Sequence, residues 1–277
     1  MAALAHTLAL LAMAVATVAN EVKPLDMAGD SFDDQYQGCG SAMTAALPAL
    51  NRSEFQKNPF FAKVWAKAAA KWQKRGPPES PLSPTQATAI VAFTMEGLHI
   101  MFNNAVRVAG RSAQDYRYNF HYKTFHFLLT DALTALRDAL KGKCTEFLLQ
   151  VCRVQFKAER GNIVRFGEFA SMSARETAGK CSGKETLFQV YTCQGVDIAF
   201  FSDNPHNLGV LIPPFETFEV TQVTESGDKA VIQLHSTGTS SKYNCEWLKG
   251  GTVSKAPFHL GGLLLATTAL AVVSGIL

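Results

Sequence analysis

The spacing of apolar residues changes part-way along the chain, from a helical period to a period near two. In the first half, Phe61, Trp65, Ala68 and Trp72 recur on one face of a helix. Gly and Pro residues within 76–81 interrupt this segment. The pattern therefore predicts an amphipathic helix that covers at least 61–72.

Two more helices are predicted further along the first half. Ser83 and Gln86 have the spacing of a capping box, and Pro84 suits the first helical position. A longer helix is predicted from about 122, with Gly142 suited to its C-terminal cap. Its apolar stripe consists of Phe125, Leu129, Ala132, Leu136 and Leu140.

The segments after Cys144 are short and alternate between apolar and polar residues. The predicted strands cover 147–156, 163–171, 186–193, 196–201, 216–223 and 229–236. A run of helices followed by a run of strands is typical of the α+β class. We therefore expect a helical part that extends to about 143 and a sheet part over 144–250.

Both ends of the chain are apolar. Residues 1–20 contain no Asp, Glu, Lys or Arg, and the apolar run closes on small residues near Ala19. This favours a secretory signal peptide over 1–19, with a first core helix as the alternative. At the other end, small residues at 250–252, a spacer and the uncharged run 260–277 favour glycosylphosphatidylinositol (GPI) attachment at Gly250 and removal of 251–277. The alternative is a membrane-spanning tail.

Composition narrows the class of protein. The 277 residues are 47% apolar, which excludes a mainly disordered chain. The formal net charge of +3 is too balanced to indicate nucleic-acid binding. With an export signal, six cysteines favour disulfides over a metal or catalytic thiols, and no metal site is predicted. Asn51 begins a glycosylation sequon, which agrees with export.

Common catalytic signatures are missing from the sequence. It contains no GxGxxG, no phosphate-binding loop, no GxSxG and no HExxH. His121 and His126 are interpreted as packed or solvated side chains rather than ligands. Arg153 is unusual because it interrupts an apolar strand. It either lies on the solvent face or binds an anion such as a phosphate.

Five blocks of sequence occur together and in order. They are FDDQYQGC at 32–39, KTFHFLLT at 123–130, RFGEFAS at 165–171, VLIPPFE at 210–216 and YNC at 243–245. Together they resemble the vertebrate GPI-anchored, arginine-specific ecto-ADP-ribosyltransferases over about 28–248. The resemblance implies a helical lobe followed by two packed, mainly antiparallel sheets with an NAD cleft between them. It also implies transfer of ADP-ribose from NAD or NADP to protein arginine, with release of nicotinamide.

The resemblance assigns roles to individual residues. Arg153 would hold the NAD diphosphate, which favours the anion interpretation of this side chain. Ser171 would orient the catalytic glutamate and the nicotinamide ribose. Glu168 and Ser202 occupy positions of polar NAD contacts. Phe93 stands near a position where relatives have an NAD-binding tyrosine.

The chain departs from the family at its third motif. The family has Glu-x-Glu directly before VLIPP, and this chain has Asn207-Leu208-Gly209. Asn207 could hydrogen-bond an acceptor arginine, but Gly209 has no side chain to stabilise the developing cation. Losing one preorganised electrostatic contact typically costs roughly 10²–10³ in rate. Asp203 and Glu216 are the acids that could substitute for the lost pair.

Two functions follow from this departure. The first is an NAD-dependent arginine mono-ADP-ribosyltransferase of weakened activity, which acts on an extracellular protein or a small guanidine. The alternative is a catalytically inactive surface protein that keeps the fold as a binding or display module. In either case we expect a glycosylated, GPI-anchored monomer on the outer face of the plasma membrane, with no nucleic-acid partner and no metal.

The resemblance also implies a pairing of cysteines. Cys39 would pair with Cys245, and Cys144 with Cys193. Cys152 and Cys181 remain, and they could form a third bridge or stay free. A thiol at Cys152 would have the guanidinium of Arg153 as a neighbour.

Overall fold

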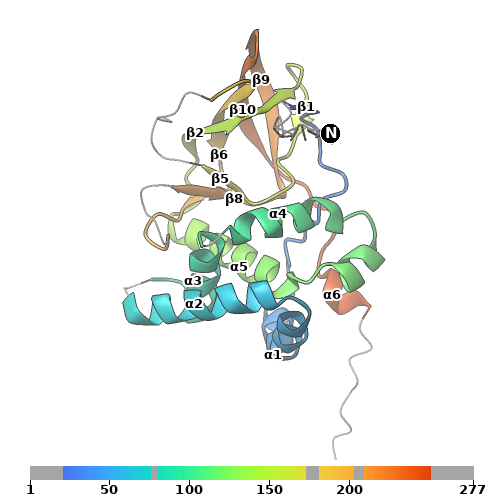
Figure 1. Ribbon diagram of the computed structural model, residues 1–277, viewed down its shortest axis with the longest axis vertical. Helices are drawn as coiled ribbons and strands as arrows, with labels where there is room; N and C mark the ends of the chain where they lie inside the picture. The colour runs from blue at the N-terminus through green and yellow to red at the C-terminus, as the bar shows by residue number, and fades with distance from the viewer. Residues whose placement is uncertain (1–20, 76–79, 96, 173–180, 203–208, 251–277) are drawn as a thin grey trace, which may run out of the picture.

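The computed structural model describes residues 21–75, 80–95, 97–172, 181–202 and 209–250. Helices gather at one end of the molecule and strands at the other, with a short sheet between them (Figure 1). This is an α+β architecture. No helix in the described part of the chain is both long and apolar enough to cross a bilayer.

The helical layer is built from the first half of the sequence. Its helices are α1 (Gly40–Lys57), α2 (Pro59–Arg75), α3 (Pro84–Phe93), α4 (Leu98–Ala109) and α5 (Lys123–Ala139). A short π-helical turn, η1 (Asp115–Asn119), precedes α5, and α6 (Glu246–Lys249) lies near the end of the described chain. These helices enclose an aromatic core that includes Phe61, Phe93, Phe102 and Phe125.

The larger sheet has five strands in the order β2-β6-β10-β9-β4. They are β2 (Thr145–Cys152), β6 (Glu185–Thr192), β10 (Lys229–Thr239), β9 (Glu216–Ser226) and β4 (Ile163–Val164). Neighbours are antiparallel except β10 and β6, which are parallel. A separate parallel pair joins β1 (Glu21–Pro24) to β3 (Val154–Lys157).

A three-stranded antiparallel sheet lies between the helices and the larger sheet. It consists of β5 (Ala170–Met172), β8 (Val210–Ile212) and β7 (Val196–Asp197), in the order β5-β8-β7. Because side chains alternate along a strand, Leu211 joins the helical core while Val210 and Ile212 join the core between the sheets. Both faces of β8 are therefore buried, which explains its unbroken apolar run.

Several predicted elements are confirmed. The helix predicted at Pro84 begins there, with a complete capping box between Ser83 and Gln86. The long helix covers Lys123–Ala139, and the N–H of Gly142 bonds to the C=O of Arg137 at 3.0 Å. Leu140 was wrongly placed in the buried stripe, because it follows the last helical residue and is 53% exposed.

Two predicted strands are each divided in the structure. The segment 147–156 breaks at Arg153, whose left-handed backbone (φ 68°) turns the chain away from β2. The segment 163–171 breaks around Gly167, which has φ 65°. A Cβ at Gly167 would lie 2.2 Å from the Cβ of Ala28, so this turn requires glycine. The helices α1 and α4 and the strand β8 were not predicted.

Arg165 joins the N-terminal segment to the C-terminal one inside the protein. Its guanidinium lies 2.6 Å from the Asp33 carboxylate, and neither side chain is more than 3% exposed. Asp33 also accepts hydrogen bonds from the backbone N–H groups of Lys242 and Tyr243. The acidic pair in the FDDQYQGC block is therefore structural.

Asp34 and a disulfide strengthen the same junction. Asp34 accepts hydrogen bonds from the backbone N–H groups of Cys245 and Glu246, at 2.9 and 2.8 Å. The neighbouring disulfide joins Cys39 to Cys245, which are 206 residues apart in sequence. Such a bridge constrains the unfolded chain over a long loop.

The other four cysteines pair as well. Cys144 is bonded to Cys193, and Cys152 is bonded to Cys181. The question left open for Cys152 and Cys181 is therefore answered by a third bridge rather than free thiols. Each of these two disulfides lies near one end of the antiparallel pair formed by β2 and β6.

His126 is packed inside the protein, as expected. Its Nδ1 lies 2.9 Å from the Tyr36 hydroxyl and its Nε2 lies 3.2 Å from the Phe32 carbonyl. A carbonyl can only accept, so Nε2 donates to it and Nδ1 accepts from Tyr36. Burial lowers the pKa of His126 from the usual 6.5 to about 3. The imidazole is therefore neutral in the folded protein.

This neutral histidine makes the stability depend on pH. Below pH 6.5 the unfolded chain binds a proton at His126 that the folded chain rejects, until the pH falls to about 3. The contribution of His126 to the free energy of unfolding is therefore complete above pH 6.5. It declines on acidification by about 1.4 kcal/mol per pH unit. We expect urea titrations to show a steeper loss of stability between pH 6.5 and 4 in the parent than in His126→Gln. Parallel pH profiles for the two proteins would contradict this assignment.

Candidate active site

Ser171 and Gly209 lie on the same face of the small sheet. Ser171 on β5 is directly opposite Leu211 on β8, so both side chains point toward the helical layer. Gly209 is two residues before Leu211 and therefore belongs to the same face. Its C=O accepts the N–H of Ile198 at 2.7 Å, which extends the pairing of β8 with β7. Diagonal neighbours of this kind are about 7–8 Å apart.

A side chain at position 209 would thus lie beside the Ser171 hydroxyl. Ser171 is half-buried and Gly209 is buried. A glutamate at 209 would find a hydroxyl donor next to it, which is the arrangement that the resemblance implies. The chain keeps the serine and the backbone frame, and it lacks the carboxylate.

Arg153 lies at the junction of β2 and β3 with an exposed side chain. Its backbone is held on both sides, since its N–H donates to the Lys184 C=O and its C=O accepts the Glu21 N–H. Strand β2 contacts β5, the strand that carries Ser171. Within the described part of the chain, the guanidinium makes no hydrogen bond or ion pair. The exposed position is compatible with both alternatives from sequence, so the role of Arg153 in binding an anion stays a prediction.

The disulfide between Cys152 and Cys181 fixes the backbone next to this arginine. Cys152 is the last residue of β2 and immediately precedes Arg153. Because Cys152 is in a disulfide, the alternative of a free thiol beside the guanidinium does not apply. The bridge instead limits how far the end of β2 can move.

Helix α4 holds the chain that leads into β5. Asn103 accepts the N–H of Phe169 and donates to its C=O, at 3.2 and 3.0 Å. One turn later, Arg107 forms an ion pair with the carboxylate of Glu168. Burial raises the pKa of Glu168, and the guanidinium of Arg107 opposes that shift. Glu168 is thus half-buried and already paired with Arg107. It lies two residues before Ala170, where β5 begins.

The ring of Phe93 lies among other aromatic rings. It is fully buried at the end of α3 and packs against Phe102 and Phe169, with ring centroids 6.5 Å away in both cases. In the structure the ring therefore supports Phe169, the residue before β5, and contact of Phe93 with NAD stays a prediction.

Ser202 is buried in a turn that α2 holds in place. Its N–H bonds to the C=O of Ile198, and its own C=O accepts from the guanidinium of Arg75 at 3.1 Å. Arg75 also donates to the Phe200 C=O at 2.6 Å. The turn leads into 203–208, so Asp203 and Asn207 lie outside the described residues.

Glu216 has a structural environment. Its buried carboxylate accepts hydrogen bonds from the Thr192 and Ser236 hydroxyls and from the N–H groups of Cys193 and Gln194. Burial raises the pKa of Glu216, and these four donors oppose the shift. Because its oxygens are fully occupied, Glu216 is not a displaced catalytic acid.

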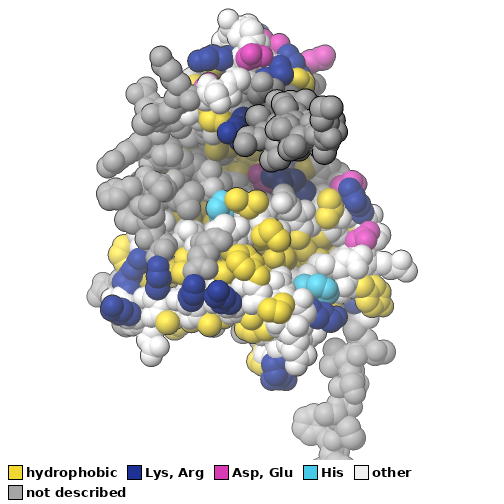
Figure 2. Space-filling view, viewed as in Figure 1, with side chains coloured by type: hydrophobic (Ala, Val, Ile, Leu, Met, Phe, Trp, Pro, Cys, Tyr) yellow, Lys and Arg dark blue, Asp and Glu magenta, His cyan; other side chains and the backbone are white. Residues whose placement is uncertain are grey.

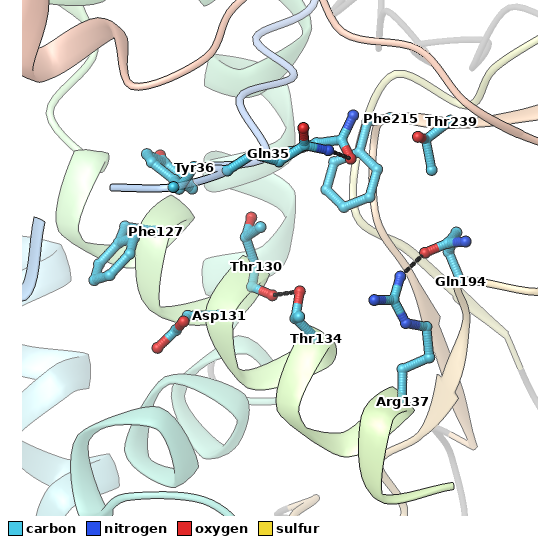
Figure 3. A pocket seen from close by; sticks show the side chains of 12 residues that line it. Gln35, Tyr36, Phe127, Thr130, Asp131, Thr134, Arg137, Gln194, Phe215 and Thr239 are labelled. Carbon is cyan, nitrogen blue, oxygen red and sulfur yellow. Dashed lines mark hydrogen bonds between the residues drawn. The ribbon is translucent and has the colours of Figure 1, made fainter. Parts of the chain in front are cut away.

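A pocket of about 400 Å³ lies away from these residues, between α5 and the chain around Phe215 (Figure 3). Arg137 on α5 reaches across it to the side-chain oxygen of Gln194. Thr134 bonds to the C=O of Thr130 within the helix. None of the residues predicted for NAD binding lines this pocket. It is therefore not the site that the sequence predicts.

Sequence reasoning missed the residues that position the site. Asn103, Arg107 and Arg75 hold Phe169, Glu168 and the 200–202 turn from the helical layer. The only available signal was the four-residue spacing of two polar side chains, Asn103 and Arg107, within the apolar segment that forms α4. That spacing alone does not indicate what the pair contacts.

The Asn51 sequon and Gly250 also have defined positions. Asn51 lies within α1 and is half-buried, so its glycosylation stays a prediction. Gly250 follows α6 as the last described residue. The predicted signal peptide and GPI-attachment segment, 1–19 and 251–277, lie outside the described residues.

Comparison with known proteins identifies the family. The family model for NAD:arginine ADP-ribosyltransferase matches residues 25–242. The erythroblast NAD(P)(+)–arginine ADP-ribosyltransferase of Gallus gallus is 45% identical over 237 residues, which are 84% of this chain and 79% of that protein. The GPI-linked NAD(P)(+)–arginine ADP-ribosyltransferase 1 of Homo sapiens is 41% identical over 271 residues, which are 91% of this chain and 83% of that protein.

Solved structures agree with this identification. The crystal structure of the eukaryotic mono-ADP-ribosyltransferase ART2.2 superposes with a TM-score of 0.69 at 32% identity, covering 80% of this chain and 98% of that one. A variant of ART2.2 in complex with NAD gives the same TM-score at 33% identity, with the same coverage of both chains. The chain therefore belongs to the family of NAD:arginine ADP-ribosyltransferases.

Proposed function

We propose that this chain binds NAD at the face of the small sheet that carries Ser171 and position 209. Arg153 at the end of β2 would hold the diphosphate. The observation that carries the proposal is the shared face of Ser171 and Gly209 on a sheet that is buried on both sides. Pairing of β5 with β8 fixes the position of Ser171 relative to residue 209.

The reaction that we propose is a slow transfer of ADP-ribose to a guanidine. The bond between nicotinamide and the ribose C1′ breaks, and nicotinamide leaves with the electron pair. A guanidine nitrogen of the acceptor then bonds to C1′ and loses a proton. Ser171 would position the ribose, but no carboxylate at 209 would stabilise the positive charge that develops on it.

We also propose an extracellular location for the protein. A signal peptide over 1–19 would direct export, and Gly250 would receive a GPI anchor. Support comes from the three disulfides, which are typical of exported proteins. A second candidate function, a catalytically inactive display module, is favoured by the single observation that Asn207-Leu208-Gly209 replaces both acids.

Binding of NAD tests the site independently of turnover. We expect calorimetric titration of the parent with NAD to show saturable binding, and Arg153→Ala to weaken it about 10- to 100-fold. A hydrogen bond between charged groups contributes about 1.5–3 kcal/mol, which corresponds to that range. Arg160→Ala is the matched control, because Arg160 is also exposed and lies outside the proposed site.

The same titrations separate the possible outcomes. Equal affinity in the parent and in Arg153→Ala would remove Arg153 from the site. Absence of any NAD binding in the folded parent would overturn the proposed function and leave the display module.

A further inference from the structure

Helix α4 carries three polar side chains at intervals of four residues, His99, Asn103 and Arg107. We name these three residues the polar stripe. Asn103 holds both backbone groups of Phe169. Arg107 pairs with Glu168, one residue earlier in the chain. The order of these contacts shows that α4 and the chain entering β5 run in opposite directions, so the polar stripe accompanies that chain into the strand.

His99 is level with Ser171 along this segment. From Asn103 back to His99 the helix axis advances about 6 Å, since each residue contributes about 1.5 Å. Two residues of strand cover about the same length, which leads from Phe169 to Ser171. Phe169 belongs to the helical core and Ala170 to the core between the sheets, so Ser171 points toward the helices again. The side chains of His99 and Ser171 are therefore at one level between α4 and β5.

The aromatic contacts of Phe93 agree with this position. The centroid of its ring lies 5.9 Å from that of His99 and 6.5 Å from that of Phe169. The opposite side of α4 faces the solvent, and Figure 2 shows hydrophobic side chains over the position of this helix. The exposed apolar residues there are Ile100, Met101 and Val108. His99 is thus on the inner side of α4, toward the candidate active site.

The Nδ1 atom of His99 is buried, and it has no hydrogen-bond partner among the described residues. A buried polar atom without a partner is unfavourable for folding, and in a native structure it calls for an explanation such as a catalytic role. The side chain as a whole is half-buried. Because the ring can turn by 180° about its Cβ–Cγ bond, this nitrogen can reach the accessible edge and meet a molecule bound in the site.

The imidazole of His99 is neutral at neutral pH. Burial lowers the pKa of His99 from its usual 6.5. The two charged groups nearest in the stripe, Arg107 and Glu168, are paired with each other. A neutral imidazole has one nitrogen that donates and one that accepts, which suits a hydroxyl group.

The elements packed against α4 are consistent with a neutral imidazole. Helix α3 contains no charged residue, and His126 of α5 is neutral. The charged side chains of η1 are bonded elsewhere, Asp115 to Ser112 and Asn119, and Arg117 to Glu246. The proton of His99 is therefore governed by burial rather than by a charged neighbour.

We propose that the imidazole of His99 binds the nicotinamide ribose of NAD through a hydrogen bond to one of its hydroxyl groups. The inference rests on the proposed function and adds a contact to the same site. The ribose is then held from β5 by Ser171 and from α4 by His99. The neutral ring carries no negative charge, so it positions the ribose without replacing the missing carboxylate. Protonation of His99 would remove its acceptor nitrogen and add a positive charge beside the ribose.

Calorimetric titration with NAD and with ADP tests this contact. ADP keeps the adenosine and the diphosphate, but it lacks the nicotinamide ribose. We expect His99→Phe to weaken NAD binding about 3- to 10-fold, the range of one neutral hydrogen bond, and to leave the affinity for ADP unchanged. Arg153→Ala should weaken the binding of both ligands, since it acts on the diphosphate. The matched control is His121→Phe at another half-buried histidine, which should leave both affinities unchanged.

Two further measurements separate a ligand contact from a structural role. The NAD affinity of the parent should fall as the pH is lowered from 6.5 to 5, and His99→Phe should show a flatter profile. Titration of Glu168, whose pKa is raised by burial, would affect both proteins alike. The melting temperature of His99→Phe should equal or exceed that of the parent, because the ring contact with Phe93 is kept and an unpartnered nitrogen is removed.

Several results would contradict the contact. They are equal NAD affinity in the parent and in His99→Phe, an equal loss of affinity for NAD and ADP, parallel pH profiles, and a lower melting temperature of the variant. Absence of NAD binding in the folded parent would remove the proposed function together with this contact. Weaker NAD binding in Arg153→Ala, with none of the loss in His99→Phe, would remove the contact alone and leave the proposed function in place.

Discussion

Restoring both acids with Asn207→Glu/Gly209→Glu is expected to raise the rate of nicotinamide release and ADP-ribose transfer by roughly 100- to 1000-fold. Gly209 lies on the face that carries Ser171, two residues before the partner of that serine in β8. A carboxylate there would be next to the ribose at which positive charge develops. The measurement is turnover of NAD in the presence of a small guanidine acceptor, with the adduct identified by its mass.

A variant with neutral amides of the same shape at both positions separates the effect of charge on the rate from the effect of contact with the substrate. Asn207→Gln/Gly209→Gln should raise the rate little, because an amide cannot neutralise the developing cation. NAD affinity should change less than the rate in both variants, since a contact made only in the transition state acts on turnover. Equal rates in the parent and in the Glu pair, with NAD still bound and the fold intact, would mean that the reaction centre lies elsewhere.

Removing the buried guanidinium in Arg165→Met is expected to lower the free energy of unfolding by about 3–5 kcal/mol. The substitution leaves the Asp33 carboxylate, which is fully buried, without its ionic partner. It also removes hydrogen bonds to the C=O groups of Met27 and Ser240, at 2.9 and 2.7 Å. Urea titration at pH 7 measures the loss.

The exposed ion pair between Lys157 and Glu225 provides the comparison. Both side chains are about 40% exposed, and Lys157→Met should cost less than about 1 kcal/mol. If Arg165→Met were no more destabilising than Lys157→Met, the buried pair would not be what joins the two ends of the chain. A double variant with Asp33→Ala should lose less than the sum of the single losses, because the two residues interact directly.

The sequence blocks behind the family resemblance are mainly structural. Asp33 and Arg165 form the buried ion pair, and Glu216 joins β6 to β9 and β10 through four hydrogen bonds. Only Ser171 among the residues of these blocks lies on the candidate reacting face as an exposed or half-buried hydroxyl. This is why the blocks identify the fold so clearly while the loss of Glu-x-Glu leaves activity as a separate question.

The parts of the fold that sequence predicted are those with local causes. The capping box at Ser83 and the stripe of α5 depend on residues within one or two turns. The strand β8 was missed because it is apolar on both faces and shows no alternation. The strand predicted over 147–156 was too long, because Arg153 adopts a left-handed backbone that no local pattern indicates.

The sequence by itself determined that a helical part precedes a sheet part, which family the chain belongs to, and that both motif acids are absent before Val210. Each of these is encoded in residues that lie next to one another in the chain. Only the tertiary structure decided that Phe93 is enclosed by aromatic rings and that Glu216 is held by four donors. Burial and electrostatic environment depend on segments distant in sequence, and those segments meet only in the folded protein.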